Sequence, residues 1–436
     1  MTYDVALDLD PTSAAVGFSD WIEGRQLVHL STNAGAPRVA FQNWRRFKEA
    51  FAPELIGQAF EETSQQLGRP VRAAIDPFGG SGTTALASQF LGVHPTTIEV
   101  NPYLADLIEA KLATYDIAAL VEAFRSVMSG DGPDVEVPFP GAPLTFVEPG
   151  VAGRYIFSQC VASRLATLRE RIGRVADPAS RRLMRVLLGS IALDVSHVVV
   201  SGKGRRYRRR WAERPVDQVL VKALFGEAVV RAIYDIQRYR HRAELGYTLL
   251  RGDARKLIQA EQELDLAVFS PPYPNSFDYT DVYNVELWVC GYLTTAEDNR
   301  SLRMSTLRSH VQIKRDFSSS GVETPTMRET IEALDCVRDR LWHRWIPDMV
   351  GAYFADMAEI FDLLSASVRA GGRAYLVVGD SRYANVDVPV AQVLLELALQ
   401  RGFEISGAEP FRSMRVSPQQ GGRAELVETL LTFTRG

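Results

Sequence analysis

Short apolar runs alternate with longer amphipathic stretches along most of the chain. The run Ala73–Asp76 ends in a glycine-rich turn, and an apolar helical stretch, Ala85–Leu91, follows it. Short apolar runs bounded by turn residues predict buried strands, whereas apolar positions three and four residues apart predict helices. Regular alternation of the two is typical of an α/β protein with a mainly parallel sheet.

This pattern predicts both the strands and the helices of the sheet. The expected strands are 73–76, 96–100, 247–250, 264–269, 373–378, 403–405 and 426–434. The expected amphipathic helices cover about residues 43–66, and then 103–115, 349–368 and 388–400.

Two long segments interrupt the alternation. Residues 154–193 and 218–242 have helical periodicity with many arginines, and they follow a breaker-rich loop that begins at Ser129. Residues 289–345 are polar around 318–321 and helical from Met327. The expected organisation is an arm at 1–42, a discontinuous α/β domain at 43–125, 246–288 and 346–436, a helical insertion at 126–245, and a second insertion at 289–345.

The composition is that of an ordinary soluble protein. The chain has 436 residues, of which 46% are hydrophobic, and a formal net charge of −4. This length suits one large α/β domain with insertions, or roughly two to three domains. No stretch approaches the ~20 apolar residues of a membrane span, and the N-terminus has no basic region followed by an apolar one. We therefore expect a cytoplasmic protein with no membrane partner.

The turn after the first strand is a strong local signal. Gly79, Gly80 and Gly82 allow a sharp turn and a close approach of the backbone to a ligand. Thr83 and Thr84 then open a helix whose first free N–H groups face the same space. The stretch lacks the lysine of a phosphate loop and the Gly-x-Gly-x-x-Gly spacing of a dinucleotide site. It suits an adenosine-bearing cofactor, with a purely structural turn as the alternative.

Three motifs in a fixed order extend this signal. They are Asp76-Pro77-Phe78-Gly79-Gly80-Ser81-Gly82-Thr83-Thr84, Thr97-Ile98-Glu99-Val100-Asn101-Pro102 and Ser270-Pro271-Pro272-Tyr273. Together they resemble the S-adenosylmethionine-dependent methyltransferases that modify exocyclic amino groups of DNA bases. The resemblance covers roughly residues 43–112 and 247–434. It implies a doubly wound, Rossmann-like methyltransferase sheet of seven strands, the last pair antiparallel, with helical insertions.

The resemblance also implies a cofactor site for S-adenosylmethionine. Glu99 would accept the ribose hydroxyls, and Asp253, after the third strand, would accept the adenine amino group. Glu99 follows the glycine turn by the roughly twenty residues expected of such an acidic group, with a surface glutamate or a helix cap as the alternative. The expected cofactor-binding residues are Asp76, Phe78, Gly79, Gly80, Gly82, Thr83, Thr84, Glu99, Asn101 and Asp253.

The expected catalytic residues are Ser270, Pro271, Pro272 and Tyr273. The prolines fix an extended backbone, so that the Ser270 hydroxyl and the carbonyl beside it point at one place. Two acceptors on the N–H groups of a ring amine would favour a more pyramidal nitrogen, aimed at the methyl carbon. Tyr273 can stack on a base that has left the duplex. This chemistry needs no metal.

The cysteines argue against three kinds of site: a disulfide framework, a zinc site and a nucleophilic cysteine. Cys160, Cys290 and Cys336 are scattered and odd in number, which argues against a disulfide framework and a zinc site. None follows a proline, whereas methylation of carbon 5 of cytosine uses a cysteine in that context. We expect three core thiols.

A basic block lies inside the helical insertion. Its cations are Lys203, Arg205, Arg206, Arg208, Arg209 and Arg210. Such a block can neutralise phosphates, which favours nucleic-acid binding, with a solvated loop that pairs with acidic residues of the protein as the alternative. Tyr207 and Trp211 suit either base stacking or anchoring of the insertion.

Other positions have weaker assignments. Asp278 and Tyr279 are expected near the base pocket, and Asp380 is expected to cap a helix. Phosphate contacts are an option for a set of cations in the second insertion, with a solvated loop as the default. This set comprises Arg300, Arg303, Arg308, Lys314 and Arg315.

The sequence thus predicts a methyltransferase that acts on a flipped DNA base, with cytosine N4 as the first choice and adenine N6 close behind. Ser270 supports this order, because the related motif leans toward cytosine when it begins with serine. Target recognition is assigned to the insertions, and a restriction or defence nuclease is the expected class of partner. An RNA amino-methyltransferase and a non-catalytic nucleic-acid binding protein are the alternatives.

Overall fold

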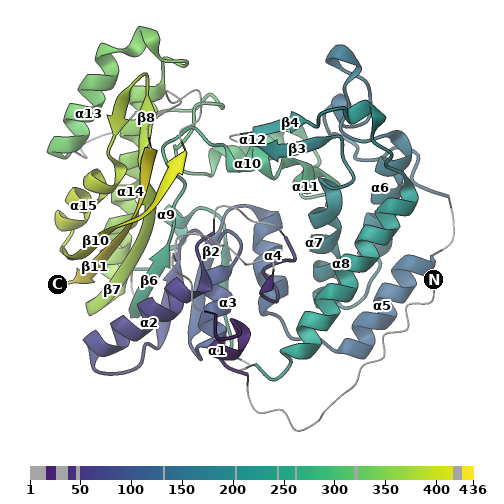
Figure 1. Cartoon of the computed structure of the whole chain (residues 1–436), viewed down its shortest axis with the longest axis horizontal. Coiled ribbons are helices and arrows are strands. Elements are labelled where there is room, and N and C mark those ends of the chain that lie inside the picture. The colour runs from purple at the N-terminus through teal and green to yellow at the C-terminus, as the bar shows by residue number, and fades with distance from the viewer. Residues whose placement is uncertain are drawn as a thin grey trace.

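Among the residues that the structure describes, seven strands form one mixed sheet (Figure 1). The computed structural model describes residues 16–25, 38–45, 50–130, 133–201, 204–242, 245–260, 263–318, 323–415 and 425–436. The strands are β1 Ala73–Asp76, β2 His94–Glu99, β5 Thr248–Arg251, β6 Leu264–Phe269, β7 Val368–Gly379, β10 Phe403–Arg415 and β11 Glu425–Arg435. Their order is β10-β11-β7-β6-β1-β2-β5, and β11 runs antiparallel to both neighbours. The predicted doubly wound sheet with an antiparallel last pair is confirmed.

The order of the strands changes direction at β1. This strand lies between β2 and β6, and Ile75 pairs with Thr96 on one side and with Ala267 on the other. The carboxyl ends of β1 and β6 therefore lie side by side at one edge of the sheet. In doubly wound sheets, such a switch point is where ligands bind.

Apolar cores cover both faces of the sheet. Leu266 and Val268 of β6 belong to one core, whereas Ala267 and Phe269 belong to the other, as expected for side chains that alternate along a strand. Burial on both faces explains why β1 and most of β6 are apolar, without the regular polar alternation of a half-exposed strand. Helices α2 Pro53–Leu67, α3 Thr83–Phe90 and α4 Pro102–Leu112 build the first core, and α14 Ile346–Ser367 and α15 Val390–Leu399 build the second.

A group of longer helices extends the first core away from the sheet (Figure 1). These are α5 Ile117–Ser129, α6 Gln159–Gly173, α7 Pro178–Ala192 and α8 Gln218–Arg238. The periodic stretch 154–193 is two helices, because Asp177 caps the second one and Pro178 begins it. The domain boundary expected at residue 125 falls inside α5, which packs against α6 and α8.

Shorter elements complete the described fold. The helices are α1 Phe18–Trp21, α9 Ala254–Leu257, α10 Tyr279–Val282, α11 Asn284–Val289, α12 Ala296–Met304 and α13 Pro325–Cys336. Two antiparallel hairpins join β3 Val198–Ser201 to β4 Gly204–Tyr207, and β8 Ser381–Tyr383 to β9 Val386–Val388. Asp380 is not the N-cap residue of α15, which is Pro389, but its carboxylate accepts a hydrogen bond from the N–H of Ala391 in the first turn of that helix at 3.2 Å. None of the described helices combines the length and apolarity needed to cross a bilayer.

Candidate active site

The glycine turn after β1 is packed too tightly for any larger residue. A Cβ on Gly79 would lie 2.4 Å from Cγ2 of Thr97, and one on Gly82 would lie 2.9 Å from Cγ1 of Ile108. Gly82 also has a φ of +77°, which residues with a side chain rarely adopt. The Gly79 N–H donates to the Ile98 carbonyl at 2.9 Å. The turn is therefore fixed against β2 and α4.

Two buried side chains connect the start of α3 and the turn before it to neighbouring elements. Thr84 donates to the Val268 carbonyl at 3.4 Å and so ties the helix to β6. The buried Lys111 ammonium donates to the Ser81 carbonyl at 2.6 Å, and burial lowers the Lys111 pKa to about 7. Lys111 belongs to no sequence motif and lies on an otherwise apolar helix face, so the sequence did not predict its contact with the turn.

Glu99, at the end of β2, connects the turn to the next helix. Its carboxylate accepts the Gly80 N–H at 2.7 Å and the Asn101 N–H at 2.8 Å. The Asn101 side chain in turn accepts the Tyr103 N–H at 3.0 Å and caps α4. Glu99 therefore has a structural role in the turn, and it also faces the cavity.

Two buried carboxyl groups lie at this end of the site. Burial raises the pKa of Asp76 to about 7, against an opposing hydrogen bond from the Phe78 N–H. Burial also raises the pKa of Glu99 to about 7, despite the hydrogen bonds from Asn101 and Gly80. Both groups therefore change charge near neutral pH. When ionised, they favour a cationic ligand.

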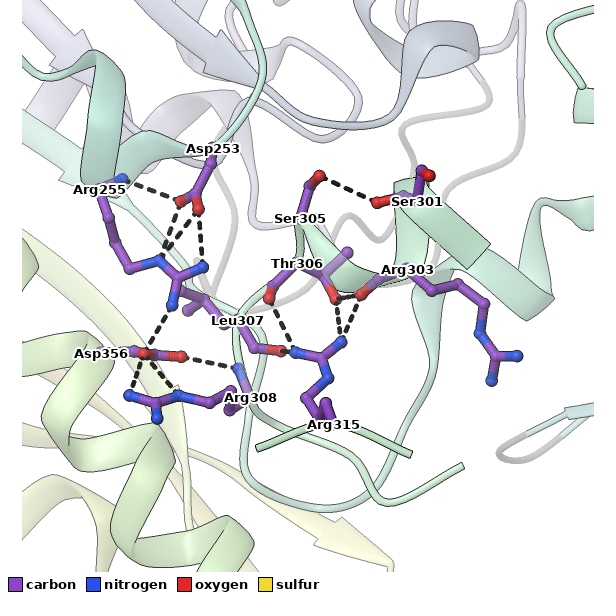
Figure 2. A network of polar contacts seen from close by, with 10 residues as sticks. All are labelled: Asp253, Arg255, Ser301, Arg303, Ser305, Thr306, Leu307, Arg308, Arg315 and Asp356. Carbon is purple, nitrogen blue, oxygen red and sulfur yellow. Dashed lines mark hydrogen bonds and ion pairs between the residues drawn. The ribbon is translucent and has the colours of Figure 1, made fainter. Parts of the chain in front are cut away.

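Asp253, just after β5, is held in an ion-pair network (Figure 2). Its carboxylate accepts from the Arg255 guanidinium at 2.7 Å. Arg255 also contacts the fully buried Asp356 of α14 at 2.6 Å. Figure 2 shows the Arg308 guanidinium converging on the same carboxylate, at 2.7 Å. The network joins the end of β5 to the second insertion.

The Ser-Pro-Pro-Tyr motif follows β6 and contacts the last strand of the sheet. The Ser270 and Tyr273 hydroxyl oxygens are 3.2 Å apart, and the Tyr273 hydroxyl donates to Oε1 of Glu428 at 3.3 Å. Glu428 pairs in register with Gly379, the last residue of β7, so it lies at the carboxyl edge of the sheet. A charged residue in the apolar run 426–431 was the sequence signal that could have identified it.

The glycine turn and the Ser-Pro-Pro-Tyr motif open into the same cavity of about 350 Å³. Every expected cofactor-binding residue except Gly82 lines it, and so does the whole Ser-Pro-Pro-Tyr motif. Ala50, Phe51, Tyr279 and Glu428 line it as well. Its volume lies in the range of about 300–1,000 Å³ typical of ligand pockets.

The second insertion forms part of the cavity wall, which the sequence did not predict. The wall residues from this insertion are Leu302, Ser305, Thr306, Leu307, Ser309 and His310. Arg315 holds the segment by donating to the Thr306 carbonyl at 3.0 Å and the Leu307 carbonyl at 3.2 Å, as Figure 2 shows. Arg303 donates to the Asp278 carboxylate at 2.8 Å.

These contacts correct the expectation for three of the five cations of the second insertion, whereas Arg300 and Lys314 are exposed, as the default expectation of a solvated loop has it. The guanidinium groups of Arg303, Arg308 and Arg315 are bonded inside the fold. They neither point to phosphate nor belong to a solvated loop. Their function is to fix the wall segment 302–310.

The basic block lies on the β3–β4 hairpin and the turn that follows it. Arg206, Arg209 and Arg210 are exposed, whereas Arg205 and Arg208 are half-buried. The Arg208 guanidinium donates to the Leu193 carbonyl at 2.9 Å, which makes it part of the hairpin's support. Lys203 lies outside the described residues. The strand β4 contacts α10, the helix that follows the Ser-Pro-Pro-Tyr motif.

The aromatic residues of this block anchor the insertion. The Tyr207 and Trp211 rings have centroids 5.7 Å apart, and Trp211 also contacts Tyr155 at 5.4 Å and His197 at 5.2 Å. Of the two options for Tyr207 and Trp211, packing inside the insertion accounts for these contacts. The expectation of three core thiols is correct for Cys290 but wrong for the other two cysteines, which are exposed.

The residues of the cavity fit S-adenosylmethionine. The backbone of Gly79 and Gly80 lines the cavity, and the acidic groups Asp76 and Glu99 suit a cation with hydroxyl groups. Phe78 adds an aromatic wall, with its ring centroid 5.8 Å from that of Phe269. The cavity thus offers acidic, apolar and backbone groups together.

Comparison with known proteins gives distant relatives. No protein-family model matches the chain. The chain is 24% identical to the type II methyltransferase M.BsoBI of Geobacillus stearothermophilus over 432 residues, covering 87% of this chain and 81% of that protein. It is 23% identical to the type II methyltransferase M.AvaI of Nostoc sp. strain PCC 7120 over 428 residues, covering 87% and 82%. Among solved structures, the rRNA methyltransferase aviRa from Streptomyces viridochromogenes is 12% identical with a TM-score of 0.28, covering 88% of this chain and 85% of that one.

Proposed function

We propose that this protein transfers the methyl group of S-adenosylmethionine to an exocyclic amino group of a DNA base. The observation that carries the proposal is that the glycine turn and the Ser-Pro-Pro-Tyr motif open into one cavity, although they are far apart in the sequence. A methyl donor and an acceptor amine must meet in such a common space. The relatives named type II methyltransferases support DNA as the substrate.

The glycine turn and the acidic residues at the strand ends would hold the cofactor. The glycine backbone approaches it closely, Glu99 accepts the ribose hydroxyls, and Asp253 accepts the adenine amino group. Glu99 and Asp253 are already oriented by hydrogen bonds to Gly80, Asn101 and Arg255, so little ordering is needed on binding. The cofactor supplies an activated methyl group with its own leaving group.

The Ser-Pro-Pro-Tyr motif would bind the target amine. The Ser270 hydroxyl and the carbonyl beside it accept the amine N–H groups, and Tyr273 stacks on the base. The base must leave the duplex to enter a cavity at the strand ends, as in other enzymes that act on bases. The Ser270 hydroxyl supports cytosine N4 as the target, with adenine N6 as the second choice.

The exposed arginines of the β3–β4 hairpin would bind the phosphates near the target base. Arg206, Arg209 and Arg210 are exposed, and their hairpin contacts α10 beside the cavity. Basic residues next to a base pocket provide the electrostatic part of DNA binding. We assign sequence recognition to the two insertions, and we propose a restriction-modification setting with a partner nuclease.

Mass spectrometry of nucleosides tests this function. Unmethylated duplex DNA and RNA are incubated separately with the protein and S-adenosylmethionine, and the modified nucleosides are identified. We expect N4-methylcytosine in DNA, and N6-methyladenine would establish the second choice. Methylated RNA with unmodified DNA would overturn the DNA assignment. Binding of DNA with no methylated product would favour a non-catalytic protein.

Ser270→Ala serves as the matched variant in the same experiment. It should lower the yield of product by roughly 100-fold, the usual cost of removing one positioned polar group from a reacting centre. Cofactor affinity should stay within about threefold of the unmodified protein, since Ser270 contacts the amine. Ser129→Ala, at the end of α5, is the control. An unchanged rate for Ser270→Ala would contradict the catalytic assignment.

A further inference from the structure

Two hydroxyl groups connect the cavity to a carboxylate on the last strand of the sheet. The Ser270 and Tyr273 hydroxyl oxygens are 3.2 Å apart, and Tyr273 Oη is 3.3 Å from Oε1 of Glu428. All three residues line the cavity. Glu428 comes from β11, which no motif of the sequence includes, and the register with Gly379 brings it to the edge where Ser270 lies.

The carboxylate fixes the direction of each hydroxyl proton. An ionised carboxylate only accepts hydrogen bonds, and a phenol has one proton to donate. The Tyr273 hydroxyl therefore donates its hydrogen bond to Glu428, and its oxygen accepts a hydrogen bond from the Ser270 hydroxyl. The lone pairs of Ser270 Oγ are then left for a ligand in the cavity. A lone serine hydroxyl would be free to donate or to accept.

We infer that Glu428 is the terminal proton acceptor of the methyl transfer and acts through Tyr273 and Ser270. This inference rests on the proposed function. It makes Glu428 a positioning residue, because the carboxylate acts through two hydroxyls and does not touch the amine. The Ser-Pro-Pro-Tyr motif has no charged side chain, and the negative charge that accepts the proton belongs to Glu428 on β11.

The proposed step is balanced. A bond forms between the amine nitrogen and the methyl carbon as the carbon–sulfur bond breaks, with its electron pair going to sulfur. The nitrogen gives one proton to Ser270 Oγ, Ser270 gives its own proton to Tyr273, and Tyr273 gives its own to Glu428. The products are a neutral methylated amine, a thioether and a carboxylic acid that later loses its proton to water.

The surroundings of Tyr273 agree with this role. Burial, and after it the neighbouring Glu428 charge, raises the Tyr273 pKa well above its ordinary value. The phenol therefore keeps its proton at neutral pH and relays a proton without losing one permanently. The Tyr273–Glu428 hydrogen bond also orients the ring that faces the base.

Steady-state kinetics of Glu428→Gln test the inference. The glutamine keeps the shape but has no charge, so kcat should fall by roughly 100-fold, the lower end of the usual contribution of a general base. The affinity for S-adenosylmethionine and the KM for DNA should stay within about threefold. For the unmodified protein, kcat should rise with pH to a plateau, and Glu428→Gln should lose this pH dependence. Glu409→Gln, an exposed glutamate on the neighbouring strand β10, is the control.

A second variant separates the relay from a general loss of packing. Tyr273→Phe interrupts the chain, so adding Glu428→Gln to it should change kcat by less than about twofold, as expected for residues that act as a unit. Glu428→Asp should recover part of the rate. Wild-type kcat and pH profile in Glu428→Gln, or equal losses with and without Tyr273, would overturn the inference.

The failure of the inference differs from the failure of the proposed function. If the unmodified protein methylates no nucleic acid, the proposed function fails and this inference fails with it. If the unmodified protein methylates DNA and Glu428→Gln does so equally well, only the inference fails.

Discussion

Glu99 performs two tasks with one carboxylate. It fixes the glycine turn through the Gly80 N–H and the next helix through the Asn101 N–H, and it faces the cavity. Glu99→Gln should weaken cofactor binding by at least roughly tenfold, because an amide offers N–H groups where the turn also offers them. Isothermal titration calorimetry measures this affinity.

The control for Glu99→Gln is Glu122→Gln, whose side chain on α5 is 77% exposed. It should bind the cofactor like the unmodified protein. Equal affinity of Glu99→Gln and the unmodified protein would show that Glu99 does not hold the cofactor.

The raised pKa values of Asp76 and Glu99 predict how stability depends on pH. A rise in pH should lower the stability of the cofactor-free protein and should increase the stabilisation that the cofactor provides. Each pKa is about 7 in the fold, whereas unfolded carboxyl groups have pKa values of about 4. Without cofactor, these groups contribute stability that is present below about pH 4 and is lost as the pH rises through about 7. A sulfonium cation favours the ionised forms, so the rise in Tm on adding S-adenosylmethionine should be largest above pH 8 and should shrink as the pH falls below about 7.

Differential scanning fluorimetry across this pH range provides the measurement. A cofactor-induced rise in Tm that is constant from about pH 5 to 9 would contradict ionisation of these two carboxyl groups on binding.

At the scale of single residues, the sequence predicted those site residues that belong to a contiguous motif. Asp76 ends an apolar strand, Glu99 ends a strand rich in β-branched residues, and Ser270 opens a motif with two prolines, so each has a local signal. Glu428 and Lys111 reach the site only through the arrangement of strands and helices. The single charge in the apolar run 426–431 marks Glu428 as unusual but does not place it at the cavity, and nothing in its own segment distinguishes Lys111.

At the scale of elements, the wall segment 302–310 depends on Asp356 of α14. The Asp356 side chain is fully buried and binds the guanidinium groups of Arg255 and Arg308 (Figure 2). Asp356→Asn removes the charge that both arginines need, and breaking a buried pair costs about 3–5 kcal/mol. The free energy of unfolding should fall by about 3 kcal/mol, and cofactor affinity should fall with it because the wall segment loosens. Chemical denaturation and calorimetry measure the two effects.

Asp362→Asn on the same helix is the matched control. The Asp362 side chain is 62% exposed and pairs with Arg401. Loss of this exposed ion pair should change the free energy of unfolding by no more than about 0.5 kcal/mol. Similar effects of the two variants would argue against a special role for the buried network.

The elements themselves were predicted well where the hydrophobic pattern is strong. The strand 264–269 is confirmed to the residue, because an apolar run ends there at Ser270 and two prolines. Helix α5 was missed, although Asp116 caps it. The β3–β4 hairpin was missed because two of the four residues of its second strand are arginines and this strand pairs with a short valine run. In these cases, tertiary pairing outweighs local preference.

At the scale of the whole molecule, the β3–β4 hairpin contacts α10, and Tyr279 and Thr280 of α10 line the cavity. Replacing Arg209 and Arg210 together by alanine should weaken DNA binding. It should also lower the slope of log affinity against log salt by about 2, since each phosphate contact contributes about 0.9. Fluorescence anisotropy at several salt concentrations measures both quantities.

Cofactor affinity should not change in this double variant, because the hairpin lies outside the cofactor site. Arg125→Ala with Arg174→Ala is the control, since these side chains, on α5 and just after α6, are 63% and 78% exposed. An unchanged salt slope for the hairpin variant would exclude the hairpin from the DNA interface.

The whole arrangement explains why the second insertion could not be assigned from the sequence. Its wall segment is held in place by arginines that bind a carbonyl of the segment and the carboxylate of Asp356. Arginines in a polar stretch have the same composition whether they bind phosphate or support a loop. Only the positions of Asp278 and Asp356 distinguish the two.

The position of a transferred methyl label tests whether this protein methylates an exocyclic nitrogen of a DNA base. The protein is incubated with duplex DNA and S-adenosylmethionine that carries a trideuterated methyl group, and the labelled nucleoside is fragmented in a mass spectrometer. We predict that the label lies on an exocyclic nitrogen, N4 of cytosine first and N6 of adenine second. A label on carbon 5 of cytosine, or no label in DNA under conditions where the cofactor binds, would contradict the account.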